Sequence, residues 1–329
     1  QPGTLKGTKA IGWFIDEYGI AQVSMNITNI NVTPLHKAFD EVCRAAAARG
    51  VRVTGTEIVG LVPKRVLIEA GTYFLEKQER SVGIPEEDII KIAIKSMSLD
   101  DLKPFNPREK VIEYLLEDAT PVKRLADLTV KEFVEETALE GPDGRLGAVM
   151  GALGAALGAM VANLSAHKRG WDDRWQEFSV KAEEGQKLMN KLMHLIDEDT
   201  DAFNEIMAAF GLPKGTDEEK AARKEAIQTA TRHAAEVPLE TVRCSYEVFD
   251  LCRAMAQEGN PASVSDAGVG ALAARAAVRG AALNVRINAA SLADKAVAEA
   301  LINEATDYEE KAERMEQEIL AIVNGKIDA

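Results

Sequence analysis

One stretch limits the folds open to this chain more than any other. Residues 146–166 form a run of 21 positions without a charged side chain, which is long enough to cross a membrane as a helix. Glycine recurs in this run at spacings of four, three and four, at Gly147, Gly151, Gly154 and Gly158. Small residues at helical spacing let a neighbouring helix approach closely, in a membrane or in a soluble bundle. The run therefore predicts a helix that is either buried or membrane-spanning.

The composition of the run favours the soluble alternative. It is mostly Gly and Ala, it contains Asn163 and Ser165, and the helical segments around it are acidic and amphipathic. We predict the buried central helix of a soluble bundle, with its glycines against a partner helix or ligand. The larger side chains would fill the core elsewhere: Met150, Leu153, Leu157, Met160 and Leu164. A membrane-associated helical protein is the alternative, and no membrane partner is expected.

Charge limits the class of partner. The 329 residues are 46% hydrophobic and 28% charged, as is usual for a globular protein, and the formal net charge is −14. Residues 119–329 hold 24 Lys and Arg against 36 Asp and Glu. A surface this acidic disfavours nucleic acid as a partner.

Cysteine and histidine usage argues against a metal site. The three cysteines lack metal-ligand spacing and do not form an even-numbered disulfide framework: Cys43, Cys244 and Cys252. The four histidines are scattered. We expect no metal and no signal peptide, and a cytoplasmic location.

Residues 1–118 predict an α+β domain. Two apolar runs, 10–15 and 19–27, are separated by three polar residues and predict a β-hairpin. Thr33 and Pro34 then open a helix through Ala48, and residues 51–59 are typical of a further strand. Helices are predicted at 63–79, 85–97 and 108–116. The natural assembly is a ferredoxin-like α+β unit.

The rest of the chain predicts a linker and an all-helical domain. Residues 119–126 are polar and contain Pro121, as is typical of a linker, and everything from 127 to 329 reads as a helical bundle. Pro238 is expected to start a new helix. The whole is a multi-domain protein, a ferredoxin-like α+β subdomain followed by an all-α bundle.

Asp199 stands out in the helix predicted over 183–210. It falls on the same helical face as an apolar series: Leu188, Leu192, Leu195, Phe203 and Ile206. A carboxylate at a core position must be paired, hydrogen-bonded or shifted in pKa, which makes Asp199 a candidate for catalysis. The alternative is a helix-to-helix hydrogen-bonding role.

A second polar stripe lies further along the chain. Asp266, Asn284 and Asn288 share one helical face that is otherwise made of Gly and Ala. Small residues leave room for a ligand, and the polar groups could bind it. The alternative is that Asp266 caps its helix and the two amides bond across helices.

Several motifs together resemble the formimidoyltransferase-cyclodeaminase family. Residues 1 to about 118 resemble the C-terminal subdomain of its transferase half, in Ile11-Gly12-Trp13, Ala21-Gln22-Val23-Ser24, Val59 to Pro63 and Ile112 to Leu115. Residues from about 127 resemble its helical cyclodeaminase domain. The motifs there are Gly151 to Gly158, Asp197 to Phe203, Gly259-Asn260 and Asn284 to Asn288.

The resemblance implies a reaction. The family's cyclodeaminase closes 5-formiminotetrahydrofolate to 5,10-methenyltetrahydrofolate and releases ammonia, so the implied substrate is a tetrahydrofolate, with or without a polyglutamate tail. The family's proton-donating aspartate matches Asp199, which is thus the expected general acid. Asp266, Asn284, Asn288 and Gly144 are expected to bind folate, and the basic pair Lys168 and Arg169 to hold its glutamate tail.

The resemblance also implies limits and an assembly. The transferase's catalytic histidine belongs to an N-terminal subdomain outside this sequence, so we expect no transferase activity from this chain alone. A homo-oligomer, with a dimer through the helical domain, is implied. The turn at residues 142–146 differs from the family's Pro-Gly-Gly-Gly-Ser. An impaired module that only binds folate or oligomerises is therefore the alternative.

Overall fold

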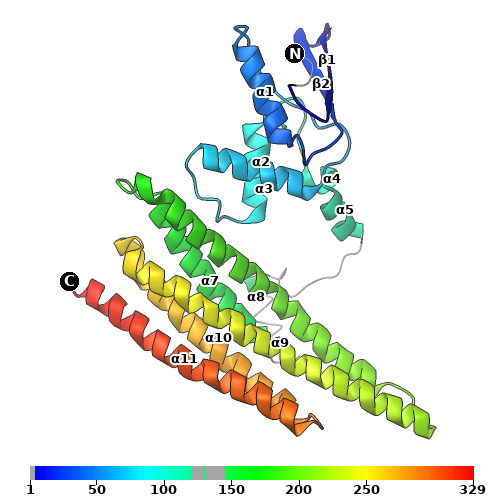
Figure 1. The fold of residues 1–329 in the computed structure, drawn as a ribbon, viewed down its shortest axis with the longest axis vertical. Coiled ribbons are helices and arrows are strands. Elements are labelled where there is room, and N and C mark those ends of the chain that lie inside the picture. Colours follow the sequence, from blue (N-terminus) through cyan, green and yellow to red (C-terminus); the bar gives the residue numbers. More distant parts are fainter. Residues whose placement is uncertain (1–3, 120–128, 131–144) are drawn as a thin grey trace. The chain divides into compact units, whose positions relative to one another are not determined.

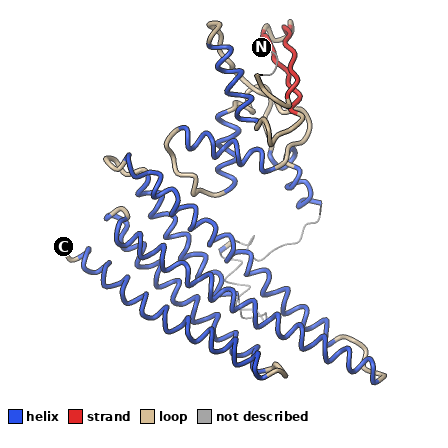
Figure 2. Tube along the Cα trace, viewed as in Figure 1, coloured by secondary structure: helices blue, strands red, loops and turns tan. Residues whose placement is uncertain are grey.

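The computed structural model describes residues 4–119, 129–130 and 145–329. The chain divides into two compact units, Gln1–Val122 and Lys123–Ala329. The first contains a small sheet and short helices, and the second consists of long helices (Figure 1, Figure 2). An α+β part followed by an all-helical part agrees with the sequence. Of the predicted linker 119–126 only Ala119 is described, so its bounds stay a prediction.

The sheet of the first unit is the predicted hairpin. Strands β1 (Thr8–Ile15) and β2 (Ile20–Ile27) pair antiparallel, with Thr8 opposite Ile27 and Ile15 opposite Ile20. Gly19 ends the connecting turn with φ of 62°, in the left-handed region that glycine adopts without strain. The alternating apolar runs and the intervening turn therefore fold as expected.

Short helices make up the rest of this unit. They are α1 (Leu35–Ala47), α2 (Lys64–Lys77), α3 (Glu86–Ser96), α4 (Pro107–Lys110) and α5 (Ile112–Ala119). Their core is a cluster that includes Leu67, Phe74, Ile90, Met97 and Val111. Helices α2 and α3 approach so closely that a Cβ on Gly71 would lie 2.1 Å from the carbonyl oxygen of Ile89.

The ferredoxin-like prediction is met only in part. Residues 51–59 were expected to form a strand, but they join no ladder and the described sheet has two strands. This segment makes single contacts instead, such as Thr56 N–H to the carbonyl oxygen of Ser98 at 3.1 Å. An extended run becomes a strand only when a neighbour offers a row of backbone partners.

The predicted helix 108–116 is broken at Val111. This residue is fully buried and extended, with φ of −90° and ψ of 123°, and it forms an isolated parallel bridge with Val62. Burying Val111 and pairing its backbone outweighs the continuity of one short helix, so α4 and α5 are separate.

The described part of the second unit consists mainly of five long helices. They are α7 (Arg145–Ala166), α8 (Trp175–Phe210), α9 (Asp217–Glu258), α10 (Val264–Ala290) and α11 (Lys295–Ile327). Short 3₁₀ turns at Asp172–Arg174 and Pro261–Ser263 precede α8 and α10. Helix α9 packs against the other four, so it, and not α7, is the centre of the bundle.

Glycines bring α7 close to its neighbours, as predicted. A Cβ on Gly154 would lie 2.8 Å from the carbonyl oxygen of Gly270 in α10, and one on Gly151 would lie 3.1 Å from Leu192 in α8. Because Gly147 meets Ala281, and Gly154 meets Gly270, α7 and α10 run antiparallel. The uncharged run thus packs backbone to backbone within one chain.

The larger side chains of α7 do not fill the core as predicted. Leu153, Met160 and Leu164 are 53%, 39% and 45% exposed, because the core-facing positions are taken by Gly and Ala. Residues 146–166 are long and apolar enough to cross a membrane, and 56% of an 18-residue stretch of them is buried inside the bundle. The buried part of the helix contacts α8, α9 and α10 of the same chain.

Pro238 does not start a helix but lies inside α9. Proline has no N–H, so the carbonyl of Ala234, four residues earlier, loses its helical partner. The side-chain amide of Asn288 in α10 donates to that carbonyl oxygen at 2.6 Å. An amide from the next helix therefore replaces the missing bond and lets α9 continue for 42 residues.

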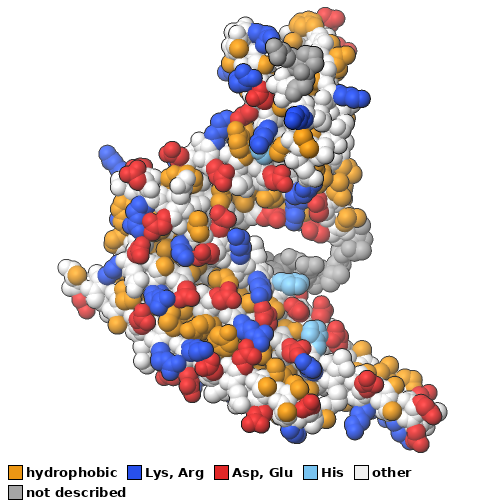
Figure 3. Space-filling model, viewed as in Figure 1, with side chains coloured by type: hydrophobic (Ala, Val, Ile, Leu, Met, Phe, Trp, Pro, Cys, Tyr) orange, Lys and Arg blue, Asp and Glu red, His pale blue; other side chains and the backbone are white. Residues whose placement is uncertain are grey.

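Charged side chains of both signs are interspersed over the visible face of the long helices (Figure 3). Many pair along one helix at spacings of three or four, such as Lys181 with Glu184 and Arg232 with Glu236. Such exposed pairs contribute only about 0.3–0.5 kcal/mol each. They keep the surface solvated and leave the packing of the bundle to its apolar core.

Candidate functional site

Asp199 lies on the face of α8 that packs against α7. Leu192, which contacts the Gly151 region of α7, is fully buried. Asp199 follows Leu192 by seven residues, or two helical turns, and so projects from the same face. It is half-buried. The predicted face of the helix is therefore the one on which the structure places this carboxylate.

The described part of α7 reaches back to the level of Asp199. Helices α7 and α8 run antiparallel, since Gly151 meets Leu192 and Ala159 meets Gly185. Moving about 10 Å along α8 from Leu192 reaches Asp199, and the same distance back along α7 reaches Arg145. The carboxylate is thus level with the first described residue of α7, at the edge of the covered face.

Asn284 reaches the same end of α7 from the opposite side. Ala281 of α10 contacts Gly147, and Asn284 lies one turn beyond Ala281 on the same face. Helix α7 packs against both α8 and α10. Asp199 and Asn284 therefore flank the start of α7, which makes this end of the bundle the candidate site.

Asn288 is at this end too, but its amide is engaged. Its Nδ2 donates to the carbonyl oxygen of Ala234, so the donor serves the break at Pro238. The interhelical role considered from the sequence is the one observed for its N–H group. A folate contact would use its second N–H or its carbonyl oxygen.

Three predicted binding residues lie toward the other end of the bundle. Asp266 precedes Gly270, which meets Gly154, so it lies about 20 Å from the start of α7 along the bundle. Lys168 and Arg169 follow the end of α7, about 35 Å from its start. Within one chain these residues and Asp199 do not meet.

The contacts of these residues are local. Lys168 Nζ lies 3.9 Å from the centre of the Trp171 ring, a cation–π contact. Asp266 does not supply the side-chain cap of α10, because the cap position is Ser263. Gly144 lies outside the described residues, as does most of the altered turn at 142–146.

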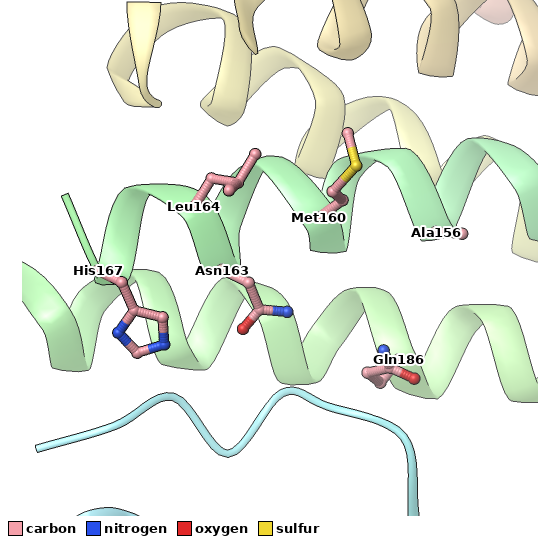
Figure 4. A pocket seen from close by; sticks show the side chains of 6 residues that line it. All are labelled: Ala156, Met160, Asn163, Leu164, His167 and Gln186. Carbon is pink, nitrogen blue, oxygen red and sulfur yellow. The ribbon is translucent and has the colours of Figure 1, made fainter. Parts of the chain in front are cut away.

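A cavity of about 410 Å³ lies near the end of α7, in a place the sequence did not single out. Asn163 and His167 project from one side of α7 and Gln186 comes from α8 (Figure 4). Its other lining residues are Ala156, Met160 and Leu164. The sequence signal for this cavity was the pair Asn163 and His167, two polar residues four positions apart at the end of the uncharged run.

A charged network lies on the neighbouring face of α8. Glu198 lines a cavity of about 300 Å³ together with His233 of α9. The Nδ1 atom of His233 lies 2.8 Å from Glu205, and its Nε2 atom 4.0 Å from Glu198. This network is adjacent to Asp199 but points away from the start of α7.

The same cavity contains a carboxylate that stays ionised. The hydrogen bond from the ammonium group of Lys191 lowers the pKa of Glu240, and the hydrogen bond from Arg243 adds to this effect, although partial burial opposes it. Burial raises the pKa of the adjacent Cys244 thiol to about 11. Neither group suits proton donation near neutral pH, since Glu240 is a carboxylate and Cys244 holds its proton firmly.

The described residues do not include a ready-made set of metal ligands. Among the residues that the structure describes, no group of three or more His, Cys, Asp or Glu side chains could hold an ion. The site at the start of α7 thus offers a carboxyl group, an amide and small-residue packing. Such a set can exchange a proton with a bound nitrogen compound and hydrogen-bond it.

Two family models match the chain. One, described as the formiminotransferase domain, covers residues 1–117, and the other, described as formiminotransferase-cyclodeaminase, covers residues 129–307. The second match alone spans more than half of the sequence. The chain belongs to the formiminotransferase-cyclodeaminase family. The resemblance seen in the sequence is therefore confirmed.

Individual relatives extend the family assignment. A formimidoyltransferase-cyclodeaminase from Gallus gallus is 35% identical over 90% of this chain and 55% of its own length. A methenyltetrahydrofolate cyclohydrolase from Methylorubrum extorquens is 39% identical over 61% of this chain and 98% of its own length. The chain spans about half the length of the bifunctional family members that it matches.

A solved structure resembles part of the chain. The formiminotetrahydrofolate cyclodeaminase from Thermotoga maritima superposes with a TM-score of 0.54 and 27% identity. The match covers 62% of this chain and all of that one. The two relatives whose names concern a tetrahydrofolate thus each match about three fifths of the chain.

Proposed function

We propose that the helical unit is a formimidoyltetrahydrofolate cyclodeaminase, which converts 5-formiminotetrahydrofolate to 5,10-methenyltetrahydrofolate and ammonia. The observation that carries the proposal is the position of Asp199, half-buried where the cover of α7 ends. Family membership supports the substrate class, and the solved cyclodeaminase supports the reaction. The proposed substrate is a tetrahydrofolate derivative.

The chemistry requires an acid at this position. Nitrogen N10 of the folate attacks the amidine carbon and forms a tetrahedral aminal. The C–N bond to the former imino nitrogen then breaks, and its electron pair leaves with the nitrogen. Because the amide anion is a very poor leaving group, this nitrogen must be protonated first. Asp199 in its acid form supplies this proton and remains in the site as a carboxylate.

Asn284 is proposed to bind and orient the same substrate. It flanks the start of α7 opposite Asp199, and its amide can both donate and accept. We propose that Asp266, Lys168 and Arg169 contact folate only if a second copy of the chain brings them to the site or if the substrate carries a long polyglutamate tail. Their distance of about 20–35 Å from Asp199 along the bundle exceeds what one folate ring system spans.

A second candidate function is methenyltetrahydrofolate cyclohydrolase. It is favoured by the relative of that name, of which this chain covers 98% at 39% identity. In that reaction water adds to the methenyl carbon, and the bond from this carbon to N5 breaks to leave a formyl group on N10. Both reactions pass through a tetrahedral carbon between two folate nitrogens, so one site could serve either.

We propose no transferase activity for this chain alone. Residues 1–117 match the transferase domain, and the chain spans 55% of the bifunctional relative from Gallus gallus. The proposal rests on the expectation that the family's catalytic histidine belongs to a subdomain other than the one that residues 1–117 resemble. A full transferase site would then require residues outside this sequence.

We also propose that two copies pair through the helical unit. Exposed Leu, Met, Val and Ile side chains lie on one side of the α7–α10 pair, namely Leu146, Leu153, Met160, Leu164, Val269, Leu272, Leu283 and Ile287. Helical geometry places both sets on the same side, because the two helices are antiparallel and each set is about 100° from the contact line. A mostly apolar face of this kind, with Arg279 as an exposed charged residue between Leu272 and Leu283, is typical of an interface between identical chains.

One assay decides between the two candidate reactions. The chain is supplied with 5-formiminotetrahydrofolate, and ammonia and methenyltetrahydrofolate absorbance are followed; methenyltetrahydrofolate is supplied separately to test hydrolysis. We expect ammonia release that falls by about 10²–10⁴ in Asp199→Asn. Hydrolysis without ammonia release would favour the cyclohydrolase. Folate binding with neither reaction would show an impaired binding module and refute both.

A further inference from the structure

An exposed aromatic ring lies beside the proposed acid. Phe203 follows Asp199 by one helical turn on the same face of α8, and its side chain is 42% exposed. Side chains four residues apart on a helix have their Cβ atoms about 6 Å apart. The ring and the carboxyl group are therefore immediate neighbours at the edge of the covered face.

Phe203 lies beyond the level of the first described residue of α7. Leu192 on this face is fully buried because α7 covers it, whereas Phe203 and Phe210 further along are 42% and 51% exposed. Next to Phe203 in sequence, Ala202 is 1% exposed and belongs to the core cluster. The backbone at this point is thus held by core packing, while the aromatic ring faces outward beside Asp199.

A rigidly based aromatic ring is suited to bind a flat heterocycle. Aromatic side chains stack on planar nitrogen bases, and one such contact typically changes binding by about tenfold or more. The pterin of a reduced folate retains a planar pyrimidine half, and N5, which bears the formimino group, belongs to the ring fused to it. A pterin lying on Phe203 places that group on the side of Asp199.

We propose that Phe203 is the stacking platform for the planar half of the pterin and positions the formimino group beside Asp199. The inference rests on the proposed cyclodeaminase function and adds a substrate-positioning residue to it. Phe203 makes no bond to the reacting atoms. Its contribution is to fix the plane of the ring so that the leaving nitrogen faces the acid.

The chain provides a matched control. Phe210 projects from the same face of α8, is similarly exposed, and lies about 10 Å further from Asp199. Phe203→Leu and Phe210→Leu remove the same ring and leave the same apolar side chain. Phe203→Tyr and Phe203→Trp keep an aromatic face at the first position.

The test measures binding and turnover separately. The probe for binding is 5-formyltetrahydrofolate, a stable compound with oxygen in place of the imino nitrogen, titrated calorimetrically into each variant. We expect Phe203→Leu to raise its Kd about tenfold, the Tyr and Trp variants to stay within threefold, and Phe210→Leu to stay within twofold. Turnover of 5-formiminotetrahydrofolate should fall in Phe203→Leu and be rescued in Phe203→Tyr.

The outcomes separate this inference from the proposed function. Equal Kd values for Phe203→Leu and Phe210→Leu would overturn the stacking role, even if the unchanged chain releases ammonia. A change in sedimentation of Phe203→Leu with an unchanged Kd would assign the ring to an interface between copies and also overturn it. Probe binding that depends on Phe203, without ammonia release, would support the platform and refute the cyclodeaminase.

Discussion

The bond from Asn288 to Ala234 can be tested through the proline that makes it necessary. In Asn288→Leu the side chain keeps its size but loses its donor, so the carbonyl oxygen of Ala234 has neither the amide nor a helical N–H. A buried carbonyl left without a partner costs about 1–3 kcal/mol. We expect the free energy of unfolding to fall by that amount.

A second background supplies the control. Pro238→Ala restores an N–H four residues after Ala234, so the helix can satisfy this carbonyl by itself. Asn288→Leu should then cost little, and the two substitutions should show a coupling of about 1–2 kcal/mol. The small cavity left by Pro238→Ala is common to both variants in that background and cancels in the comparison.

The assay is urea denaturation of all four proteins followed by circular dichroism. An equal loss from Asn288→Leu in both backgrounds would refute the reasoning, because it would show that the amide does not compensate for the proline. Binding of 5-formyltetrahydrofolate to the same proteins separates the two roles of Asn288. Unchanged binding in the double variant would leave Asn288 a structural residue only.

Three further predictions follow from packing and charge. Gly154→Ala should lower the Tm by about 2–8 °C, because the added Cβ would lie 2.8 Å from a backbone oxygen. At Gly280 the nearest atom to an added Cβ is 4.0 Å away, so Gly280→Ala should raise the Tm. Thermal denaturation measures both changes. Glu240→Gln should cost about 0.5–1 kcal/mol at pH 7. Since the native pKa of Glu240 is lowered, this stabilisation is complete above the unfolded pKa and is lost as pH falls through the native pKa. The difference in stability between the two proteins should therefore shrink as the solution is made more acidic. Ile287→Arg should convert a dimer to monomers in analytical ultracentrifugation, and a monomeric unchanged chain would contradict the α7–α10 interface.

Helical periodicity and end signals account for what the sequence could predict. The uncharged run predicts a helix from local residues, and the structure has α7 there. In the structure Thr216 caps α9 and Asp294 caps α11, so these two starts are also determined by local side chains. The capping box of Thr216 with Glu219 is formed by both reciprocal bonds. Local rules were sufficient wherever one segment determines its own conformation.

The sequence failed where a distant partner decides. Residues 51–59 have the composition of a strand, but a ladder depends on a neighbour that periodicity cannot supply. Pro238 would end an isolated helix, and only the amide of Asn288, 50 positions later, lets α9 continue. Both errors came from interactions between segments.

The candidate site shows the same division. The face of Asp199 was predictable from spacing along α8, and its neighbour Phe203 was visible as part of the same face. Which other polar residues share its end of the bundle was not predictable. That depends on the antiparallel register of α7 with α8 and α10, and this register places Asn284 near Asp199 and Asp266 about 20 Å away.

The end of α7 also divides the bundle into regions of unequal local stability. The described helices α7, α10 and α11 start or end near the level of Asp199, while α8 and α9 continue as a helical hairpin to the turn at Gly211. Amide protons of residues 203–230 should then exchange with solvent through local openings that leave the five-helix region intact. Phe203 lies at this boundary, so a ring bound on it would slow exchange in the hairpin and couple substrate occupancy to its order.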